Sequence, residues 1–389
     1  MRTTLIVFRN LLIPLILAGL LMLGLLVGLV FLIGRSAPHL NPLDAFALRL
    51  SLALRSADLD TPAGIDGTVA CFTVIEGDTA ATIANRLVAQ GFEINPEVFR
   101  AYVRFFAIDS KLQAGSFVLK KTMTIPQIAT KLTNAGADSV TFRVIEGWRL
   151  EEIAATIDQT PDLTFRGAEF LTLVGAGFGG VGGYLPEFAA RAGIPPGHSL
   201  EGFLFPDTYQ LPACGTAADL VVRMLQNFDV RIPQQLRDDS VKGGLTLYEA
   251  VTLASIIQRE AVLDEERAVI AGVYLNRLKN SRAGTPDAAT PRTLDADPTI
   301  QYALGNTRDP NTWWAALTLA DYRGVNSPFN TYLNPGLPPT PIANPGLASI
   351  RAAIYPQTTD YIYFRACGGE GGRHRFSRTF AEHNAACSN

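Results

Sequence analysis

The sequence lacks several features that mark common classes of protein. Its charge is nearly balanced, with 33 Lys and Arg against 36 Asp and Glu, and the charged residues are scattered rather than gathered in blocks. Nucleic-acid-binding proteins usually carry a basic patch or excess, so we expect no nucleic-acid partner. The four cysteines include no CxxC pair and the four histidines no HExxH motif, which disfavours zinc and thioredoxin-type chemistry.

A nucleotide site is also disfavoured, although residues 174–183 formally contain GxGxxG at Gly175, Gly177 and Gly180. A dinucleotide-binding loop needs a strand before the glycines and a helix after them. A helical pattern precedes these glycines instead, and Pro186 follows soon after. We therefore expect a surface loop at this point and predict neither a metal nor an organic cofactor.

The chain has one long apolar run. After a short tail, residues 1–10, residues 11–34 carry no charge and are rich in Leu, Val and Ile. A helix of that length spans about 36 Å, enough to cross a hydrocarbon core of about 30 Å. A cleavable signal peptide is the alternative, but its apolar region is normally shorter and ends in a small-x-small site. We predict a single membrane anchor; with arginines on both sides of it, the positive-inside rule does not set its orientation.

The number of cysteines indicates whether the protein folds in an oxidising compartment. An even number fits an oxidising exterior and one or two disulfides. Cys367 and Cys387 both fall in the last stretch of the chain and are the favoured pair. Four unrelated buried thiols are the alternative.

An internal repeat follows a predicted stem at residues 35–68. Cys71-Phe-Thr-Val-Ile-Glu-Gly-Asp-Thr begins one copy and Phe142-Arg-Val-Ile-Glu-Gly-Trp-Arg the other. Both patterns indicate a short strand, a Glu-Gly turn, a polar cap and a helix. The unit resembles LysM-type modules, which bind chains containing N-acetylglucosamine, so we expect an α+β LysM-like module over residues 69–160. A spacer of the same topology that binds nothing is the alternative.

The rest of the chain, residues 161–389, has a mixed α+β pattern. Within the module we expect helices at 78–90, 96–107 and 124–134 and a strand at 115–120. Beyond it we expect helices at 217–229, 246–261, 264–280 and 347–355 and a strand at 360–365.

Glu260 is the most informative residue of this region. Thr246 followed by Glu249 is a capping-box signature, which predicts that a helix begins there. Glu260 then falls on a stripe with Ile256 and Ile257. A carboxyl group on that stripe would lose water, which raises its pKa and lets it act as a general acid near neutral pH. A glutamate at a helix end that simply reaches solvent is the alternative.

The segment around Glu260, Leu253-Ala-Ser-Ile-Ile-Gln-Arg-Glu-Ala, resembles the YceG-like (MltG) family of endolytic murein transglycosylases. Further motifs occur in the family's order. They are Leu200-Glu-Gly-Phe-Leu-Phe-Pro-Asp-Thr-Tyr, Val273-Tyr-Leu-Asn-Arg-Leu, Asp297-Pro-Thr-Ile-Gln-Tyr, Asn330-Thr-Tyr, Gly336-Leu-Pro-Pro-Thr-Pro-Ile-Ala-Asn-Pro-Gly, Tyr361-Ile-Tyr-Phe and His374-Arg-Phe-Ser with His383-Asn384. Two departures lie near the expected cleft: a longer loop at residues 279–293, and Leu294-Asp-Ala-Asp-Pro-Thr where the family has Leu-Gln-Ser-Asp-Pro-Thr.

The resemblance implies a membrane-anchored cell-wall enzyme whose bulk faces the periplasm or cell exterior. Its substrate would be nascent peptidoglycan glycan strands, cut internally between N-acetylmuramic acid and N-acetylglucosamine, near the synthases that polymerise them. The family's catalytic glutamate maps onto Glu260. A transglycosylase needs one acid, because the muramyl C6 hydroxyl attacks its own C1 and leaves a 1,6-anhydro end, whereas a hydrolase normally needs two carboxylates.

Other polar residues are weaker candidates for contact with the sugars. They are Glu201, Asp207, Asp297, Asn330, Tyr332 and His374. Capping, turn or structural roles are the alternatives for these residues. Two rival functions also stay open: a hydrolase of the same glycan with Asp297 or Glu201 as base, and a non-catalytic glycan-binding scaffold.

Overall fold

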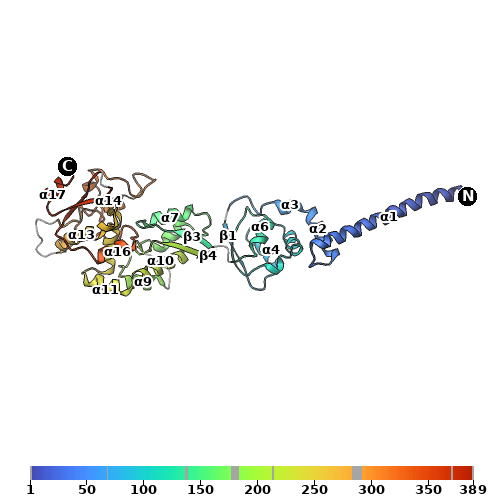
Figure 1. Ribbon diagram of the computed structural model, residues 1–389, viewed down its shortest axis with the longest axis horizontal. Coiled ribbons are helices and arrows are strands. Elements are labelled where there is room, and N and C mark those ends of the chain that lie inside the picture. Colours follow the sequence, from blue (N-terminus) through green and yellow to red (C-terminus); the bar gives the residue numbers. More distant parts are fainter. Residues whose placement is uncertain are drawn as a thin grey trace. The chain divides into compact units, whose positions relative to one another are not determined.

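The computed structural model shows a mixed α+β protein and describes residues 2–67, 69–135, 139–176, 184–212, 214–282, 291–368 and 371–387, without the side chains of residues 2–16, 184 and 282 (Figure 1). The chain divides into two compact units. Unit 1 is Met1–Ser139 with Pro212–Cys214, and unit 2 is Val140–Leu211 with Gly215–Asn389. Most of the predicted glycine-rich loop, at residues 177–183, and residues 283–290 of the long loop lie outside the described residues.

Unit 1 starts with a long helix and continues as a small α+β fold. Its elements are α1 (Arg2–Ser36), α2 (Pro42–Leu54), α3 (Ser56–Asp60), β1 (Val69–Val74), α4 (Ala80–Ala89), α5 (Pro96–Phe105), the 3₁₀ turn η1 (Asp109–Lys111), β2 (Gly115–Lys120) and α6 (Ile125–Lys131). Within α1, Leu17–Ser36 has a mean hydropathy of 2.7 and is exposed. By length and composition it can cross a membrane, and among the described residues it is the one helix that can.

Strand β1 runs antiparallel to β2, with Phe72 opposite Phe117. Both phenylalanines are fully buried, together with Ile83 of α4 and Phe99 of α5. The helices form because Thr79 and Asn95 cap them: each side chain accepts backbone N–H groups of the first turn, which would otherwise lack partners.

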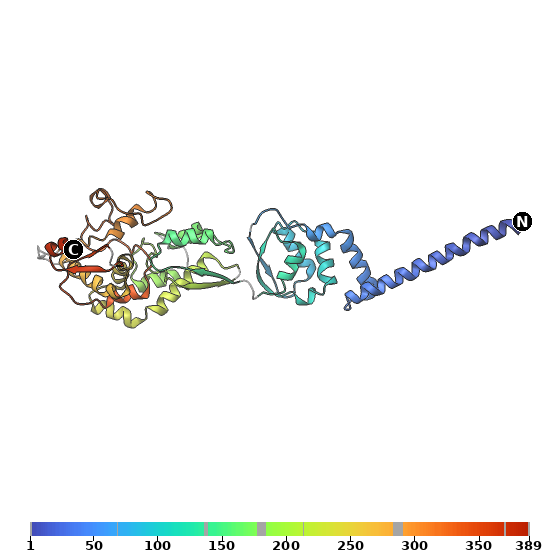
Figure 2. The same ribbon diagram turned by 45° about the horizontal axis from the view of Figure 1, so that its top comes forward.

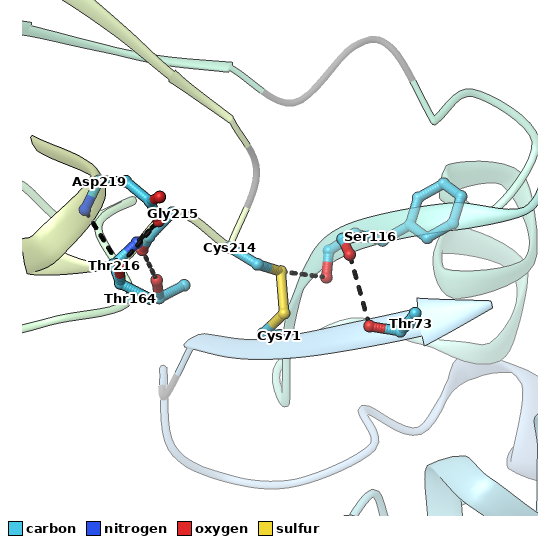
Figure 3. The surroundings of a disulfide bond; sticks show 9 residues. Cys71, Thr73, Ser116, Thr164, Cys214, Gly215, Thr216 and Asp219 are labelled. Atoms are coloured by element: carbon cyan, nitrogen blue, oxygen red, sulfur yellow. Dashed lines mark hydrogen bonds between the residues drawn. A yellow bond between two sulfur atoms is a disulfide. The ribbon is translucent and has the colours of Figure 1, made fainter. Parts of the chain in front are cut away.

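A disulfide ties the returning segment 212–214 to this sheet (Figure 3). It joins Cys71 of β1 to Cys214, with a Cα–Cα distance of 5.3 Å and a sequence separation of 143 residues. Cys214 has a φ of 64°, in the left-handed region that costs a non-glycine residue free energy. The covalent bond holds the backbone in this conformation.

Both predicted repeats form a strand, a turn and a helix. The first is β1 with α4; the second is β3 (Ser139–Arg143) with α7 (Leu150–Gln159). Gly77 and Gly147 occupy equivalent turn positions with φ of 89° and 84°, which explains the glycine in each copy. Unit 1 ends at Ser139, so residues 140–160, which the sequence assigns to the LysM-like module, belong to unit 2.

Unit 2 is mainly helical with two small sheets, β3 with β4 and β5 with β6 (Figure 2). Besides β3 and α7 its elements are α8 (Gly167–Val174), α9 (Tyr184–Ala192), β4 (Thr208–Pro212), α10 (Ala217–Arg231), α11 (Gln234–Lys242), α12 (Leu247–Glu260), η2 (Asp264–Glu266), α13 (Arg267–Arg282), α14 (Asp297–Leu304), α15 (Asp321–Gly324), α16 (Leu347–Ile354), β5 (Tyr363–Ala366), β6 (His374–Ser377) and α17 (Phe380–Ala385).

Helix α12 is the central element of unit 2. The predicted capping box is confirmed: Thr246 caps the first turn and Glu249 bonds back to the Thr246 backbone. Every residue from Ala250 to Ile257 is buried, and the helix packs against α16 and α13. A helix enclosed on all sides holds its last residue, Glu260, in a defined position.

The C-terminal hairpin completes unit 2. Strand β5 pairs antiparallel with β6, with Phe364 opposite Phe376. Cys367 and Cys387, the pair that the sequence favours, form a disulfide with a Cα–Cα distance of 5.4 Å. This bond fastens the end of α17 to the end of β5. All four cysteines of the chain are therefore in disulfides.

Candidate functional site

Glu260 ends α12 with its carboxyl group facing a cavity of about 390 Å³. The side chain is half-buried. Its Oε1 accepts a hydrogen bond of 2.9 Å from the hydroxyl of Tyr274, a residue of α13 that is 1% exposed. Because Tyr274 is fixed by the core, the carboxyl group that it binds has one preferred orientation.

The surroundings of Glu260 favour its protonated form. Burial is the largest cause and raises the pKa of Glu260, as does the nearby Asp297 carboxylate. The Tyr274 hydrogen bond and the guanidinium groups of Arg277 and Arg259 lower it. The resulting pKa is about 7. A carboxyl group with a pKa near neutral pH is present in both protonation states. It can therefore give up a proton and take one back.

A second carboxylate, Asp297, lines the same cavity. It is the first residue of α14, and two tyrosines donate to it: Tyr332 to Oδ1 at 2.7 Å and Tyr322 to Oδ2 at 3.2 Å. Hydrogen bonds from both sides orient the group. Glu260 and Asp297 thus meet the cavity with different hydrogen-bond partners.

Arg277 joins the elements around this cavity. It lies one turn after Tyr274 on α13 and is 6% exposed. Its guanidinium donates to the carbonyls of Leu294 and Ile362, both at 2.7 Å, and to Asp295 at 2.9 Å. Asp295 has a φ of 52°, and burial raises its pKa despite the neighbouring Arg277 charge. Strained non-glycine backbone of this kind concentrates at functional sites.

The C-terminal hairpin and α17 supply the opposite wall. Nδ1 of His374 lies 2.8 Å from Oε2 of the buried Glu266, which also accepts the His374 backbone N–H. The ring of His383 lies against Tyr363 at 5.3 Å. Its Nδ1 is buried without a hydrogen-bond partner, and burial, with the charges of Arg365 and Arg277, lowers its pKa. A neutral imidazole therefore faces the cavity.

The cavity wall combines acids, cations, tyrosines and histidines. Its lining residues are Glu260, Arg277, Leu294, Asp295, Asp297, Tyr322, Tyr332, Phe364, Arg365, Ala366, His374 and His383. All of them belong to unit 2. Such a polar, open surface suits a hydroxyl-rich ligand. Among the described residues, no three His, Cys, Asp or Glu side chains are placed to hold a metal ion.

Four of the sequence-predicted site residues meet in this cavity: Glu260, Asp297, Tyr332 and His374. Glu201 does not line it. This residue is fully buried, and its carboxyl group accepts from the Leu150 N–H at 3.2 Å and the Asn344 amide at 3.0 Å. Burial raises its pKa to about 8. Its contacts are those of a residue that joins the start of α7 to the segment before α16.

Asp207 and Asn330 also lie outside the cavity wall. Asp207 accepts from Asn227 at 3.0 Å and from Arg231 at 2.9 Å. Asn330 is fully buried and donates to the carbonyls of Tyr322 and Val325. Its amide therefore supports the loop that presents Tyr322 to the cavity, rather than facing the cavity itself.

Larger cavities lie elsewhere among the described residues. One of about 550 Å³ lies among α9, α10 and α11 in unit 2, where Asp229 is paired with both Arg191 and Arg237. Another, of about 590 Å³, lies in unit 1 among α2, α4 and α5, and a third, of about 450 Å³, lies along α1. Chemistry and not size marks the Glu260 cavity as the candidate functional site, because it holds a half-buried acid whose pKa is raised by burial.

The sequence assigned no role to several residues in or beside the cavity. Tyr274 and Arg277 are three apart on α13, so they share a helix face, but nothing local showed that this face meets the end of α12. Tyr322 lies in the four-residue helix α15 and Asp295 in the segment before α14, and neither segment is long enough to show a periodicity. Only the tertiary contacts of these residues reveal their place.

Known proteins are similar to this chain over most of its length. The model of the YceG-like family matches residues 72–389. An endolytic murein transglycosylase of Bacillus subtilis is 30% identical over 82% of this chain and 84% of its own length. One of Streptococcus pneumoniae is 28% identical over 79% of this chain and 57% of its own length.

A solved structure is also similar. The 2.6 Å crystal structure of a putative yceG-like protein from Listeria monocytogenes has a TM-score of 0.51 and 29% sequence identity, and the match covers 82% of this chain and all of that one. Glu260 and every other residue of the cavity wall lie within the family match. The chain therefore belongs to the YceG-like family, the family of these endolytic murein transglycosylases.

Proposed function

We propose that this protein is a lytic transglycosylase that cuts peptidoglycan glycan strands internally, with Glu260 as its single general acid and base. The observation that carries the proposal is the carboxyl group of Glu260, held by Tyr274 at the edge of the cavity with a pKa of about 7. Its place in a YceG-like chain supplies the substrate class: the relatives above are murein transglycosylases.

In the proposed reaction, protonated Glu260 gives its proton to the oxygen between N-acetylmuramic acid and N-acetylglucosamine as the bond from that oxygen to C1 breaks. The C6 hydroxyl of the muramyl sugar then attacks C1, and the Glu260 carboxylate accepts the hydroxyl proton. The products are a 1,6-anhydromuramyl end and a free N-acetylglucosamine 4-hydroxyl. Glu260 gives up one proton and takes up one, so it returns to its protonated state, and no water is consumed. Intramolecular attack supplies much of the rate through positioning.

Asp297 has an electrostatic role in this scheme. The transition state carries positive charge at C1 and the ring oxygen, and a carboxyl group fixed by Tyr322 and Tyr332 needs no reorganisation to stabilise it.

Asp297 also leaves one alternative function open. A hydrolase of the same bond would use Asp297 as the base that activates water, and the structure places it in the same cavity as Glu260. Glu201, the other base considered, does not line that cavity.

We further propose that α1 anchors the protein in the cell membrane and that both units lie on the periplasmic or extracellular side, where disulfides persist. Two disulfides that use all four cysteines support this placement. For the first repeat, which lies wholly in unit 1, we propose a LysM-like glycan contact that delivers strands from the synthases to unit 2.

The test is mass spectrometry of uncrosslinked glycan strands after incubation with the full-length protein in detergent. Wild type should produce anhydromuramyl ends, and Glu260→Gln should produce none. Glu265→Gln, an exposed glutamate in the next turn of chain, is the matched control and should cut like wild type. Muramyl ends that are heavier than the anhydromuramyl ends by the mass of one water would establish a hydrolase instead. Cleavage by neither wild type nor Glu260→Gln would favour the glycan-binding scaffold.

A further inference from the structure

Helix α2 of unit 1 is apolar on two opposite faces, although only one of them is covered by protein. Ala45 and Leu52 are buried in the core of unit 1. Leu43, Leu50 and Leu54 are 71%, 47% and 78% exposed. Exposed leucines are common singly, but three on one helix face form a patch that is normally covered by a partner or a membrane.

The geometry of a helix separates the two faces. Successive residues are about 100° apart around the axis, so Leu43 and Ala45 lie about 200° apart, as do Leu50 and Leu52. Leu43, Leu50 and Leu54 follow the spacing i, i+7, i+11, which keeps them within about 40° of each other. The exposed leucines therefore point away from the core of unit 1.

Helix α2 is also the element that follows the apolar helix. Helix α1 ends at Ser36 and α2 begins at Pro42. The two helices are in contact, since a Cβ added at Gly34 would lie 3.1 Å from that of Pro42. Both views show α1 running outward from α2, away from β1 and α4 (Figures 1 and 2). Helix α2 therefore lies next to the end of the apolar segment Leu17–Ser36.

Cations border the leucine face where a bilayer would place its phosphates. Arg35, in the last turn of α1, is exposed. Arg49, on the flank of α2, is also exposed, and its guanidinium carbon lies 5.9 Å from the centre of the Phe105 ring. Long basic side chains beside an apolar helix face are the pattern of helices that lie in the membrane interface.

We propose that α2 lies in the headgroup boundary of the bilayer that α1 spans, with Leu43, Leu50 and Leu54 among the acyl chains. The inference rests on the proposed anchor function of α1. It explains why an exposed helix is rich in leucine on its outer side. It also has a functional consequence: a second contact five residues from the span holds unit 1 at the membrane surface instead of letting it swing on a single helix.

The experiment places a fluorescent probe at single positions of the full-length protein. Leu50→Cys, labelled with an environment-sensitive NBD dye, is reconstituted in nanodiscs of phosphatidylethanolamine and phosphatidylglycerol with nitroxide-labelled acyl chains. Leu25→Cys, in the span, is the positive control. Ile65→Cys, fully exposed in unit 1, is the water-exposed control. Far-UV circular dichroism and glycan cleavage verify that each labelled protein is folded with its disulfides intact.

We expect a blue-shifted emission at position 50 and a loss of fluorescence to acyl-chain nitroxides approaching that at position 25, with no loss at position 65. Solvent-like emission and no quenching at position 50, with position 25 quenched, would overturn the proposal and leave a protein partner as the occupant of the leucine face. Absence of quenching at position 25 as well would show instead that the anchor itself is wrong. Leu50→Asp should abolish the blue shift of a probe at position 54.

Discussion

The hydroxyl of Tyr274 donates a 2.9 Å hydrogen bond to Oε1 of Glu260 from a helix neighbouring the one that the glutamate ends. A hydrogen bond to the charged form of an acid favours that form. The bond therefore opposes burial, which acts on the same carboxyl group in the other direction. Together they bring the pKa of Glu260 to about 7.

Replacing Tyr274 by Phe should raise the pKa of Glu260, because the donor that stabilises the carboxylate is lost. Hydrogen bonds to charged groups contribute about 1.5–3 kcal/mol, so a rise of about one to two units in the pKa of Glu260 is expected. The alkaline limb of the pH profile of kcat/KM for glycan cleavage, which reports loss of the acid's proton, should move to higher pH. Tyr355→Phe removes a hydroxyl bonded to Asp239, away from the cavity, and should leave the profile in place.

Replacing Asp297 by Asn should move the same limb the other way. The Asp297 charge raises the pKa of Glu260, so its removal makes the glutamate lose its proton at lower pH. The maximal rate should also fall, by about 10²-fold, if an electrostatic stabiliser of the transition state is lost. If the Asp297→Asn variant kept both the alkaline limb and the maximal rate of wild type, Asp297 would have no role in the site. Glu265→Gln again provides the control.

Removing the Cys367–Cys387 disulfide should impair activity more than stability. The bond holds α17 and His383 beside the cavity and closes a short loop, with a separation of 20 residues. The double serine variant should therefore cleave glycan several-fold more slowly at 25 °C, with a modest decrease in Tm.

The matched control is the double serine variant of Cys71 and Cys214. That bond spans 143 residues, and longer loops stabilise more, by about 3 kcal/mol for 15 residues and nearly 5 for 100 in the chain-entropy model. This variant should lose more Tm yet retain the cleavage rate of short soluble glycans at 25 °C. Equal rates for both variants would refute a positioning role for the C-terminal bond.

Glu201 should act through stability and not through substrate binding. Its pKa is raised by burial to about 8 in the folded protein, against about 4.3 when unfolded. Between these values the folded state holds one more proton than the unfolded state, so this residue's contribution to stability decreases as pH rises. Above pH 8 no further change is expected from it.

Glu201→Gln removes this dependence. At pH 5 the variant should be less stable by about 1–3 kcal/mol, because its amide turns a donor toward the Leu150 N–H or the Asn344 amide. Wild type should lose roughly 3–4 kcal/mol between pH 5 and pH 8, at about 1.36 kcal/mol per pH unit, so the difference in Tm between wild type and variant should shrink as pH rises and reverse sign by pH 8. The KM of the folded variant for glycan should match wild type; an increased KM without a stability change would return Glu201 to the substrate site.

Local patterns were sufficient for much of the secondary structure. The helix predicted from the capping box at Thr246 and the strand predicted at 115–120 both occur at those positions. The predicted boundary near residue 160 differs from the structural division at Ser139. The repeat suggested one module because its two copies share a local pattern, but each copy packs its helix into a different core. Sequence similarity between the copies carries no information about that choice.

The sequence also could not distinguish the predicted site residues that face the cavity from those that do not. Asp297 and Tyr332 are separated by 35 residues yet joined by a 2.7 Å hydrogen bond. Asn330, two residues from Tyr332, faces the interior. Both are polar residues in one motif, and no periodicity distinguishes them, because the segment is irregular.

The amino-acid sequence by itself determined the apolar helix and the family and predicted Glu260 as the candidate acid, since each depends on residues that are neighbours along the chain or on one helix face. Only the tertiary structure decided which groups set the chemistry of that acid. Tyr274 and Arg277 come from α13 and Asp297 from α14, and the pKa of Glu260 depends on their distances and on exclusion of water. Those quantities exist only once the core has closed around α12.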